Sequence, residues 1–128
     1  MKIKKLNLGE IKKVGDDFLC FNESLLEANL TNLVEAEDSF LEFNVVLQEL
    51  NCPKLAKVGN RFLLRSNHLR KIDFPNLVSA GMNFICWNKL TEEINLPMIK
   101  NADVGFLWRN DTSAAMKAKK SCRQGNEN

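Results

Sequence analysis

Little in this sequence points to a metal or redox centre. There is a single histidine, His68, and the four cysteines form no C-x-x-C pair. Zinc sites need clusters of these ligands at short spacings. We therefore expect no metal and no cofactor. The cysteines are Cys20, Cys52, Cys86 and Cys122.

Excess charge is also scarce. The chain has 18 lysines and arginines against 16 aspartates and glutamates, so its formal net charge is only +2. Binding to nucleic acid or to an anionic membrane through electrostatics needs a larger basic excess. The sequence therefore predicts no nucleic-acid partner and no membrane partner.

Long hydrophobic runs are missing as well. No stretch approaches the roughly 20 apolar residues that a membrane-spanning helix needs. The basic start, residues 1–5, is followed by Asn7, Gly9 and Glu10 rather than by an apolar segment, so the sequence predicts no secretory signal. The default expectation is a cytoplasmic protein with reduced thiols.

What the sequence does have is a period of 22 residues. Phenylalanine recurs at this interval, and a column of small apolar residues lies four positions before it. The phenylalanine column is Phe18, Phe40, Phe62, Phe84 and Phe106. The small column is Val14, Ala36, Val58, Ala80 and Ala102. A fixed period of this length indicates a stacked solenoid of repeats.

One unit shows which kind of repeat is present. Residues 47–55 read L-x-x-L-x-C-P-x-L, and V-G-x-x-F-L follows at 58–63. The unit resembles a leucine-rich repeat and is similar to the bacterial BspA-like surface class. The resemblance covers about residues 3–112. It implies an α/β solenoid, a right-handed superhelix with a parallel β-sheet on its concave face and short helical or 3-10 turns on its convex side.

The same resemblance implies that ligands bind at the concave sheet. It also allows a secreted or cell-surface location if the chain is a fragment of a larger protein. The period divides the chain into a solenoid domain, 1–112, and a tail, 113–128. The domain contains five predicted coils: 3–24, 25–46, 47–68, 69–90 and 91–112.

Each coil is predicted to hold one strand followed by turns. The segment 47–53 alternates like a strand, and Pro53 ends it because proline lacks an N–H donor. Strands of successive coils are expected to pair in parallel, about 4.8 Å apart. A short helical turn is expected later in the coil, with Val14 and Phe18 one turn apart.

Two further columns carry expectations about the backbone. Gly15, Gly59 and Gly81 are predicted to adopt a positive φ, so Glu37 and Asp103 in the same column predict strained or different turns. A polar column either bonds to neighbouring backbone or consists of simple turn residues. That column is Asn22, Asn44, Ser66, Asn88 and Asn110.

Both terminal coils are as apolar as the middle ones. Ile3 and Leu6 begin the first coil and Ile99 and Phe106 lie in the last, with no recognisable polar cap at either end. Repeat proteins normally need such caps. The sequence therefore predicts a fragment of a longer solenoid or, alternatively, end-to-end self-association. The basic tail is expected to be a frayed helix or disordered, or else a docking segment for an acidic partner.

Outward side chains of the predicted sheet form the candidate binding surface. A rigid scaffold displays them in columns, with acidic and basic patches alternating. They are Glu27, Asn29, Gln48, Glu49, Asn51, Arg70, Lys71, Asp73, Glu92, Glu93 and Asn95. The alternative is a solvated face with weak cross-strand ion pairs.

The leading interpretation is a protein-protein interaction scaffold that binds a protein partner through this sheet. The runner-up is a structural or adhesive segment of a larger bacterial surface or effector protein. An enzyme is not expected. Glu27 and Glu49 have a spacing that suits a carboxylate pair, but no histidine or metal spacing supports them. His68 is expected at a coil corner and Cys52 in the core.

One aromatic column is expected to cover the outer edge of the core. It contains Phe21, Phe43 and Trp87, and Arg65 and Arg109 fill its two other places. A nucleic-acid stacking platform would combine such aromatics with a basic groove. The small net charge does not offer one.

Overall fold

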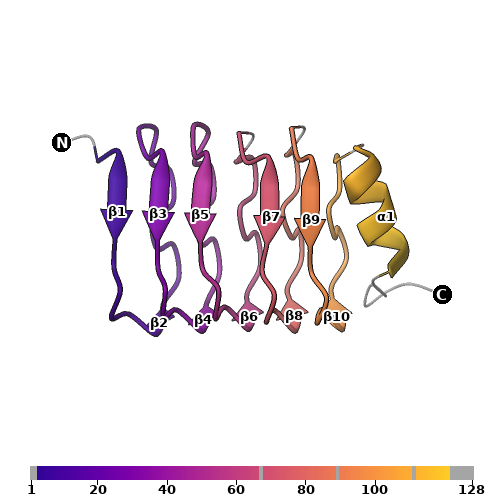
Figure 1. Ribbon diagram of the computed structural model, residues 1–128, viewed down its shortest axis with the longest axis horizontal. Coiled ribbons are helices and arrows are strands. Elements are labelled where there is room, and N and C mark those ends of the chain that lie inside the picture. Colours follow the sequence, from indigo (N-terminus) through magenta and orange to yellow (C-terminus); the bar gives the residue numbers. More distant parts are fainter. Residues whose placement is uncertain (1–2, 67, 89, 111, 122–128) are drawn as a thin grey trace.

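The chain forms a parallel-strand β-solenoid of about four turns, with about 22 residues in each turn (Figure 1). The computed structural model describes residues 3–66, 68–88, 90–110 and 112–121. The turns stack in a row that runs from the N-terminal end to helix α1 (Ser113–Ser121). The solenoid architecture predicted from the period is confirmed.

Two sides of each turn are strands, and every strand pair among the described residues is parallel. One side, here called the odd side, carries β1 (Lys5–Asn7), β3 (Glu27–Asn29), β5 (Glu49–Asn51), β7 (Lys71–Asp73) and β9 (Glu93–Asn95). The even side carries β2 (Lys13–Val14), β4 (Glu35–Ala36), β6 (Lys57–Val58), β8 (Ser79–Ala80) and β10 (Asn101–Ala102).

The third side of each turn, residues 17–21 and their equivalents, is not the helical turn that the sequence analysis predicts. Alternate residues there have positive φ, in the first turn 63°, 58° and 58° at Asp17, Leu19 and Phe21. The amides of these alternate residues point in turn toward the next and the preceding turn of the stack. The Leu41 amide donates to the Phe18 carbonyl (3.2 Å), and the Phe43 amide donates to Leu64 (2.8 Å). A helix would keep these hydrogen bonds within one turn, whereas here they join neighbouring turns.

The glycine column serves close packing rather than the positive φ predicted for it. None of its three glycines has a positive φ. Glu37 and Asp103, which replace glycine in this column, do not have one either, so the predicted strain in their turns is wrong. A Cβ at Gly81 would lie only 2.8 Å from the backbone carbonyl carbon of Gly59. Glycine is needed at this position because two turns of backbone approach each other closely.

The phenylalanine column forms one continuous spine through the core. Rings from successive turns stack with centroids 5.3 to 6.2 Å apart. Phe40, Phe62 and Phe84 are fully buried. Stacked aromatic pairs contribute about 0.5–1.5 kcal/mol beyond the area that they bury. The spine predicted from the 22-residue spacing is confirmed.

Four members of the polar column beside the third side are buried and bond to backbone of the preceding turn. Asn22, the first member, is half-buried and donates to Cys20 of its own turn (3.4 Å). Asn44 donates its side-chain amide to the Leu19 carbonyl (2.7 Å), and Asn88 donates to Leu63 (3.0 Å). Ser66 fills the same role, with its hydroxyl donating to a carbonyl one turn back (3.0 Å). Of the two expectations for this column, bonding to neighbouring backbone is therefore the one that holds.

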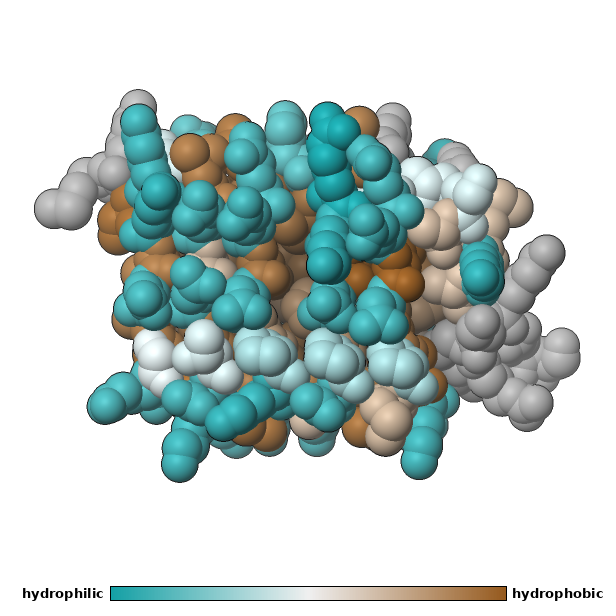
Figure 2. All heavy atoms as spheres, in the orientation of Figure 1, coloured by the Kyte–Doolittle hydropathy of each residue, from teal (hydrophilic) through white to brown (hydrophobic). Residues whose placement is uncertain are grey.

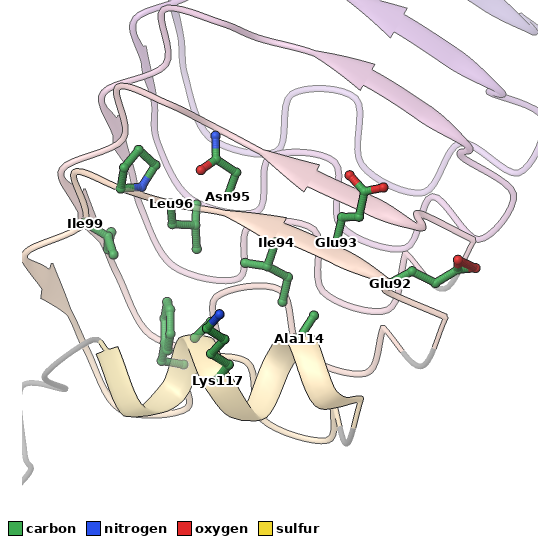
Figure 3. A pocket seen from close by; sticks show the side chains of 11 residues that line it. Glu92, Glu93, Ile94, Asn95, Leu96, Ile99, Ala114 and Lys117 are labelled. Atoms are coloured by element: carbon green, nitrogen blue, oxygen red, sulfur yellow. The ribbon is translucent and has the colours of Figure 1, made fainter.

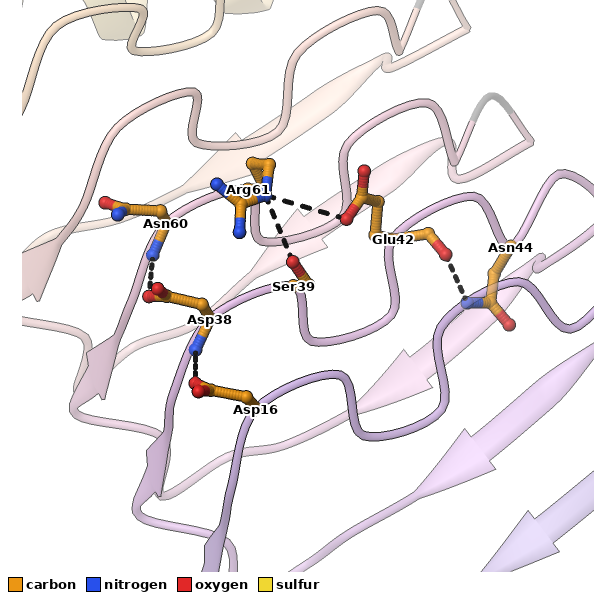
Figure 4. Close-up of polar contacts among 7 residues, drawn as sticks. All are labelled: Asp16, Asp38, Ser39, Glu42, Asn44, Asn60 and Arg61. Carbon is orange, nitrogen blue, oxygen red and sulfur yellow. Dashed lines mark hydrogen bonds and ion pairs between the residues drawn. The ribbon is translucent and has the colours of Figure 1, made fainter.

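A second polar ladder follows the even strands and was not anticipated from the sequence (Figure 4). The Asp38 amide donates to the Asp16 carboxylate (3.0 Å), and the Asn60 amide donates to Asp38 (2.9 Å). The Met82 amide continues the ladder to the side chain of Asn60 (2.8 Å). Each side chain thus satisfies a backbone donor of the next turn at the corner.

The odd side is split between β5 and β7, where the sequence analysis predicts a continuous sheet. Strands β1, β3 and β5 form one sheet and β7 and β9 another, whereas all five even strands pair continuously. Figure 1 shows β5 and β7 farther apart than the other odd neighbours. The split lies between Cys52 and Phe74, the smallest and largest side chains of their inward column. The Phe74 ring packs edge-on against Phe62 (5.4 Å), and we attribute the separation to this change of side-chain size.

Helix α1 packs against β9 and covers part of the last turn. Within the helix, Ala115 is fully buried and Ala118 packs against the core. No such cover of the last coil was expected from the sequence. At the other end Ile3 remains 47% exposed and Leu6 is half-buried. No helix among the described residues is long and apolar enough to cross a membrane.

Candidate binding surface

All eleven predicted binding residues lie on or beside the odd strands, and none of them is buried. Hydrophilic side chains cover most of this face, with apolar patches visible between them (Figure 2). The split between β5 and β7 divides the face into two regions. The face contains two hollows, one at the split and one at the C-terminal end, and ten of the eleven residues line one hollow or the other.

The central hollow lies at the split and has a volume of about 410 Å³. Its apolar floor is Leu50, which is only half-buried although it stands in the middle of the stack. The remaining lining is polar apart from Ala28. Seven predicted residues line the hollow: Glu27, Asn29, Gln48, Glu49, Asn51, Lys71 and Asp73.

The terminal hollow lies between β9 and α1 and has a volume of about 530 Å³. In Figure 3, Ile94 extends from β9 toward the helix, and Lys117 lies on the helix side. The apolar floor includes Phe106, the last ring of the spine. The predicted residues in this lining are Glu92, Glu93 and Asn95.

Charges on the odd side are mixed rather than of one sign. Lys5 lies 3.9 Å from the Glu27 carboxylate. The Arg70 guanidinium lies 2.8 Å from the Glu92 carboxylate in the neighbouring turn. Arg70 is the one predicted residue outside both linings. Exposed pairs of this kind contribute about 0.2–1 kcal/mol each, so they set the charge pattern more than the stability.

Backbone groups also face the split. Where other neighbouring odd strands meet, the amide that follows one strand and the amides at the start of the next strand donate to backbone carbonyls of the facing strand. The Leu30 amide, for example, donates to the Asn51 carbonyl (2.9 Å). The equivalent amides at the split belong to Cys52, Arg70 and Lys71. Within the described ranges, none of these three donates to a backbone carbonyl of the facing strand.

The sulfur and imidazole groups lie where the sequence analysis places them. Cys52 is buried in the core, and burial raises the pKa of its thiol from 9.0 to about 12. Cys20 and Cys52 are free thiols, and the Cys86 thiol donates to the Gly105 carbonyl (3.0 Å). Cys122, which the sequence places in the tail, lies outside the described residues. His68 is exposed at a corner, where its Nδ1 lies 2.6 Å from the Val45 carbonyl oxygen.

The sequence pattern predicts the polar residues of the hollows but not the hollows themselves. The central one depends on the unpaired junction, whose only sequence signal is the step from Cys52 to Phe74. The terminal one depends on α1, whose alanines and lysines were read as a tail. Comparisons of the chain with protein-family models, with curated proteins and with solved structures found no match.

Proposed function

We propose that the protein is a protein-interaction module that binds an extended segment of a protein partner in the central hollow of its odd side. The observation that carries the proposal is the unpaired junction of β5 and β7, lined by seven outward polar residues. The site is displayed by a solenoid that is rigidly stacked on its other two sides.

Unpaired backbone at the junction supports strand addition as the binding mode. Sheet edges with free N–H and C=O groups accept a further extended strand from another chain. The Cys52, Arg70 and Lys71 amides are the donors that such a strand would meet. Main-chain hydrogen bonds would supply affinity, and side chains of the lining would supply specificity.

The side chains of the hollow support recognition of a segment with alternating character. Leu50 provides an apolar floor, Glu49 adds a negative charge on the β5 side, and Lys71 adds a positive charge on the β7 side. An extended segment presents successive side chains to opposite faces. An apolar residue directed at Leu50, with charged neighbours on either side, would match this pattern.

The enzyme alternative has less support from the same lining. Glu27, one of the two carboxylates considered for catalysis, is paired with Lys5. His68 is not among the lining residues of the hollow. The side chains that line the hollow are therefore better suited to hydrogen bonding and ion pairing with a partner than to acid-base catalysis.

We further propose that the chain is a leucine-rich repeat of five coils. The L-x-x-L-x-L spacing supports this assignment, as do the five odd strands, one in each proposed coil. The third side departs from the pattern because it has alternating positive φ where the resemblance implies helical turns. The proposed partner surface is the one that the resemblance describes as the concave sheet.

A peptide selection tests the binding proposal. Linear peptides are selected from a display library on the wild-type protein and then measured against Leu50→Arg and Lys71→Glu. We expect each change to weaken the selected peptides at least about tenfold, that is, by about 1.4 kcal/mol. Lys57→Glu, on the exposed face of β6, is the matched control and should leave affinity unchanged. Peptides that bind both hollow variants as well as wild type would contradict the proposal.

The structural or adhesive alternative is favoured by one observation, the incompletely covered first turn. Ile3 is 47% exposed, and Leu6, Leu8 and Ile11 are only half-buried. Apolar surface of this kind associates with another turn in an end-to-end contact. Sedimentation over a range of concentrations tests this alternative: wild type should self-associate and Leu6→Glu should not.

A further inference from the structure

The third side carries a row of aromatic and arginine side chains, which we call the aromatic–arginine stripe. It has one member in each turn, and Trp108 stands beside the last. The members are Phe21, Phe43, Arg65, Trp87, Arg109 and Trp108. The row begins with Phe21 and Phe43, whose rings stack at 4.9 Å with an angle of 8° between their planes.

The two guanidinium groups are stacked on aromatic rings. The Cζ atom of Arg65 lies 4.5 Å from the ring centroid of Trp87 and 5.9 Å from that of Phe43. The Cζ atom of Arg109 lies 5.0 Å from Trp87 and 4.8 Å from Trp108. Stacking on rings fixes the plane of a guanidinium and leaves its N–H edges available to acceptors.

These two arginines differ from others in the described part of the chain. Arg61 lies 3.7 Å from the Glu42 carboxylate and Arg70 lies 2.8 Å from Glu92. No carboxylate of a described residue lies within 4.0 Å of Arg65 or Arg109, and both are exposed. The stripe therefore presents two positive charges without a counter-charge among the described residues.

The two aromatic residues at the ends of the stripe are exposed as well, whereas Phe43 and Trp87 are half-buried. Phe21 is 63% exposed and Trp108 is 50% exposed. Tryptophan and arginine are the residues most enriched among the energetically dominant positions of protein interfaces. Large exposed rings beside unpaired guanidinium groups thus form a surface that offers apolar area and attracts negatively charged groups of a partner.

We propose that the stripe is a second interaction surface, which binds an acidic segment of a protein partner. Carboxylates of the segment pair bidentately with Arg65 and Arg109, whose planar forks match that geometry. The two arginines are two turns apart, so the paired carboxylates lie roughly 10 Å from each other. Aliphatic or aromatic side chains between them cover Trp87 and Trp108.

Charge distribution favours a protein segment over single-stranded nucleic acid. A nucleic-acid site follows the phosphates with a continuous basic groove. Only two of the six members of the stripe are cations, and the chain as a whole has a net charge of +2. The proposal is independent of the odd-side hollow, because it rests on different residues on another side of the turn.

Intrinsic fluorescence provides a direct test. The chain has two tryptophans, both in the stripe, and no tyrosine, so emission excited in the near ultraviolet reports on the stripe. A synthetic peptide that repeats Glu-Leu-Leu, whose successive carboxylates are about 10 Å apart in an extended chain, is titrated into the full chain at low ionic strength. We expect a saturable change that weakens with added salt. The same peptide with glutamine in place of glutamate should bind at least about tenfold more weakly.

Variants locate the effect. Arg65→Gln and Arg109→Gln should each lower affinity about tenfold or more, whereas Lys57→Gln, on the exposed face of β6, should leave it unchanged. Arg65→Lys and Arg109→Lys keep the charge but lose the planar fork, so their affinity should lie between these values. Circular dichroism confirms folding of each variant. If a glutamine variant does not fold, the lysine variant at that position decides.

Three results would overturn the proposal. The first is no saturable change with the acidic peptide. The second is wild-type affinity in the folded glutamine variants or, where the lysine variants decide, wild-type affinity in those. The third is a thymidine oligonucleotide that binds the stripe more tightly than the acidic peptide, because this result would assign the surface to nucleic acid.

Discussion

The even and odd sides of the solenoid are built from the same repeat, yet only one of them is continuous. Five even strands pair without interruption, whereas the odd strands divide into groups of three and two. The inward column of the even side contains only valine and alanine, as in Val58 and Ala80. The odd side instead steps from Cys52 to Phe74 at the split. Uniform small residues keep neighbouring turns close, and one change of size separates them.

The phenylalanine spine is what lets the two sides differ without breaking the stack. Its rings remain stacked across the split, with Phe62 and Phe84 at 5.6 Å. The split is therefore local to one side of the turn. Strict repetition supports stability on the even side and the spine, and the departure from it produces the candidate binding surface.

Removal of a ring from the spine should have the largest effect. Phe62 is fully buried between two other rings, so we expect Phe62→Ala to destabilise the protein by about 3–5 kcal/mol. Glu49→Ala on the odd side should change stability by less than about 0.5 kcal/mol. Equal urea midpoints for the two variants would refute the assignment of inside and outside.

Close approach of the turns can be tested at the glycine column. A Cβ at Gly81 would lie 2.8 Å from backbone atoms of two residues in the preceding turn, whereas one at Gly15 meets nothing nearer than 3.8 Å. We expect Gly81→Ala to cost about 1–3 kcal/mol and Gly15→Ala to be close to neutral. Thermal melts compare them, and a stable Gly81→Ala protein would show that the turns can move apart.

The next largest loss of stability is expected in the buried polar column. Asn88→Ala removes one of two donors to the Leu63 carbonyl, which keeps its bond from the Ser66 amide (3.2 Å). We therefore expect a loss of about 0.5–1.5 kcal/mol, the net contribution of one hydrogen bond. Asn51→Ala removes an exposed asparagine from the odd side and should be nearly neutral. Denaturant unfolding measures both, and a neutral Asn88→Ala would mean that water replaces the lost bond.

Cys52 should make stability fall at high pH. Its thiol has a pKa of about 12 in the folded protein and 9.0 as the reference value. Below pH 9 both states are protonated and the contribution is fully present. It is lost between about pH 9 and 12, because only the unfolded state ionises there, with a slope of up to about 1.4 kcal/mol per pH unit. Unfolding at pH 8 to 10.5 should show a shallower fall for Cys52→Ala, and identical slopes would contradict the burial of this thiol.

The smallest change in stability is expected for a variant that closes the split. Phe74→Leu restores the residue type that the inward column has at Leu30 and Leu96. We expect stability to change by less than about 1.5 kcal/mol, because the swap is between similar apolar side chains. Hydrogen exchange at the Cys52 amide should slow as β5 and β7 pair. Unchanged exchange would show that the size of residue 74 is not the cause of the split.

The sequence predicted the features that depend on strict repetition. The period of Phe40, Phe62 and Phe84 was enough to derive the spine, and the outward columns named the polar residues of both hollows. The third side was mispredicted, because residues such as Leu41 and Ile85 ordinarily avoid positive φ and nothing local signals it. The split was missed because register within one turn does not determine the spacing between turns.

Hydrogen exchange at the junction tests the central claim most directly. The amides of Cys52, Arg70 and Lys71 face the split, whereas those of Leu30, Gln48 and Glu92 occupy equivalent positions at paired junctions. Exchange of each backbone amide, resolved by nuclear magnetic resonance, should be markedly faster for the first three than for the second three. Equal protection of the two sets would mean that β5 and β7 are paired in solution and that the central hollow does not exist.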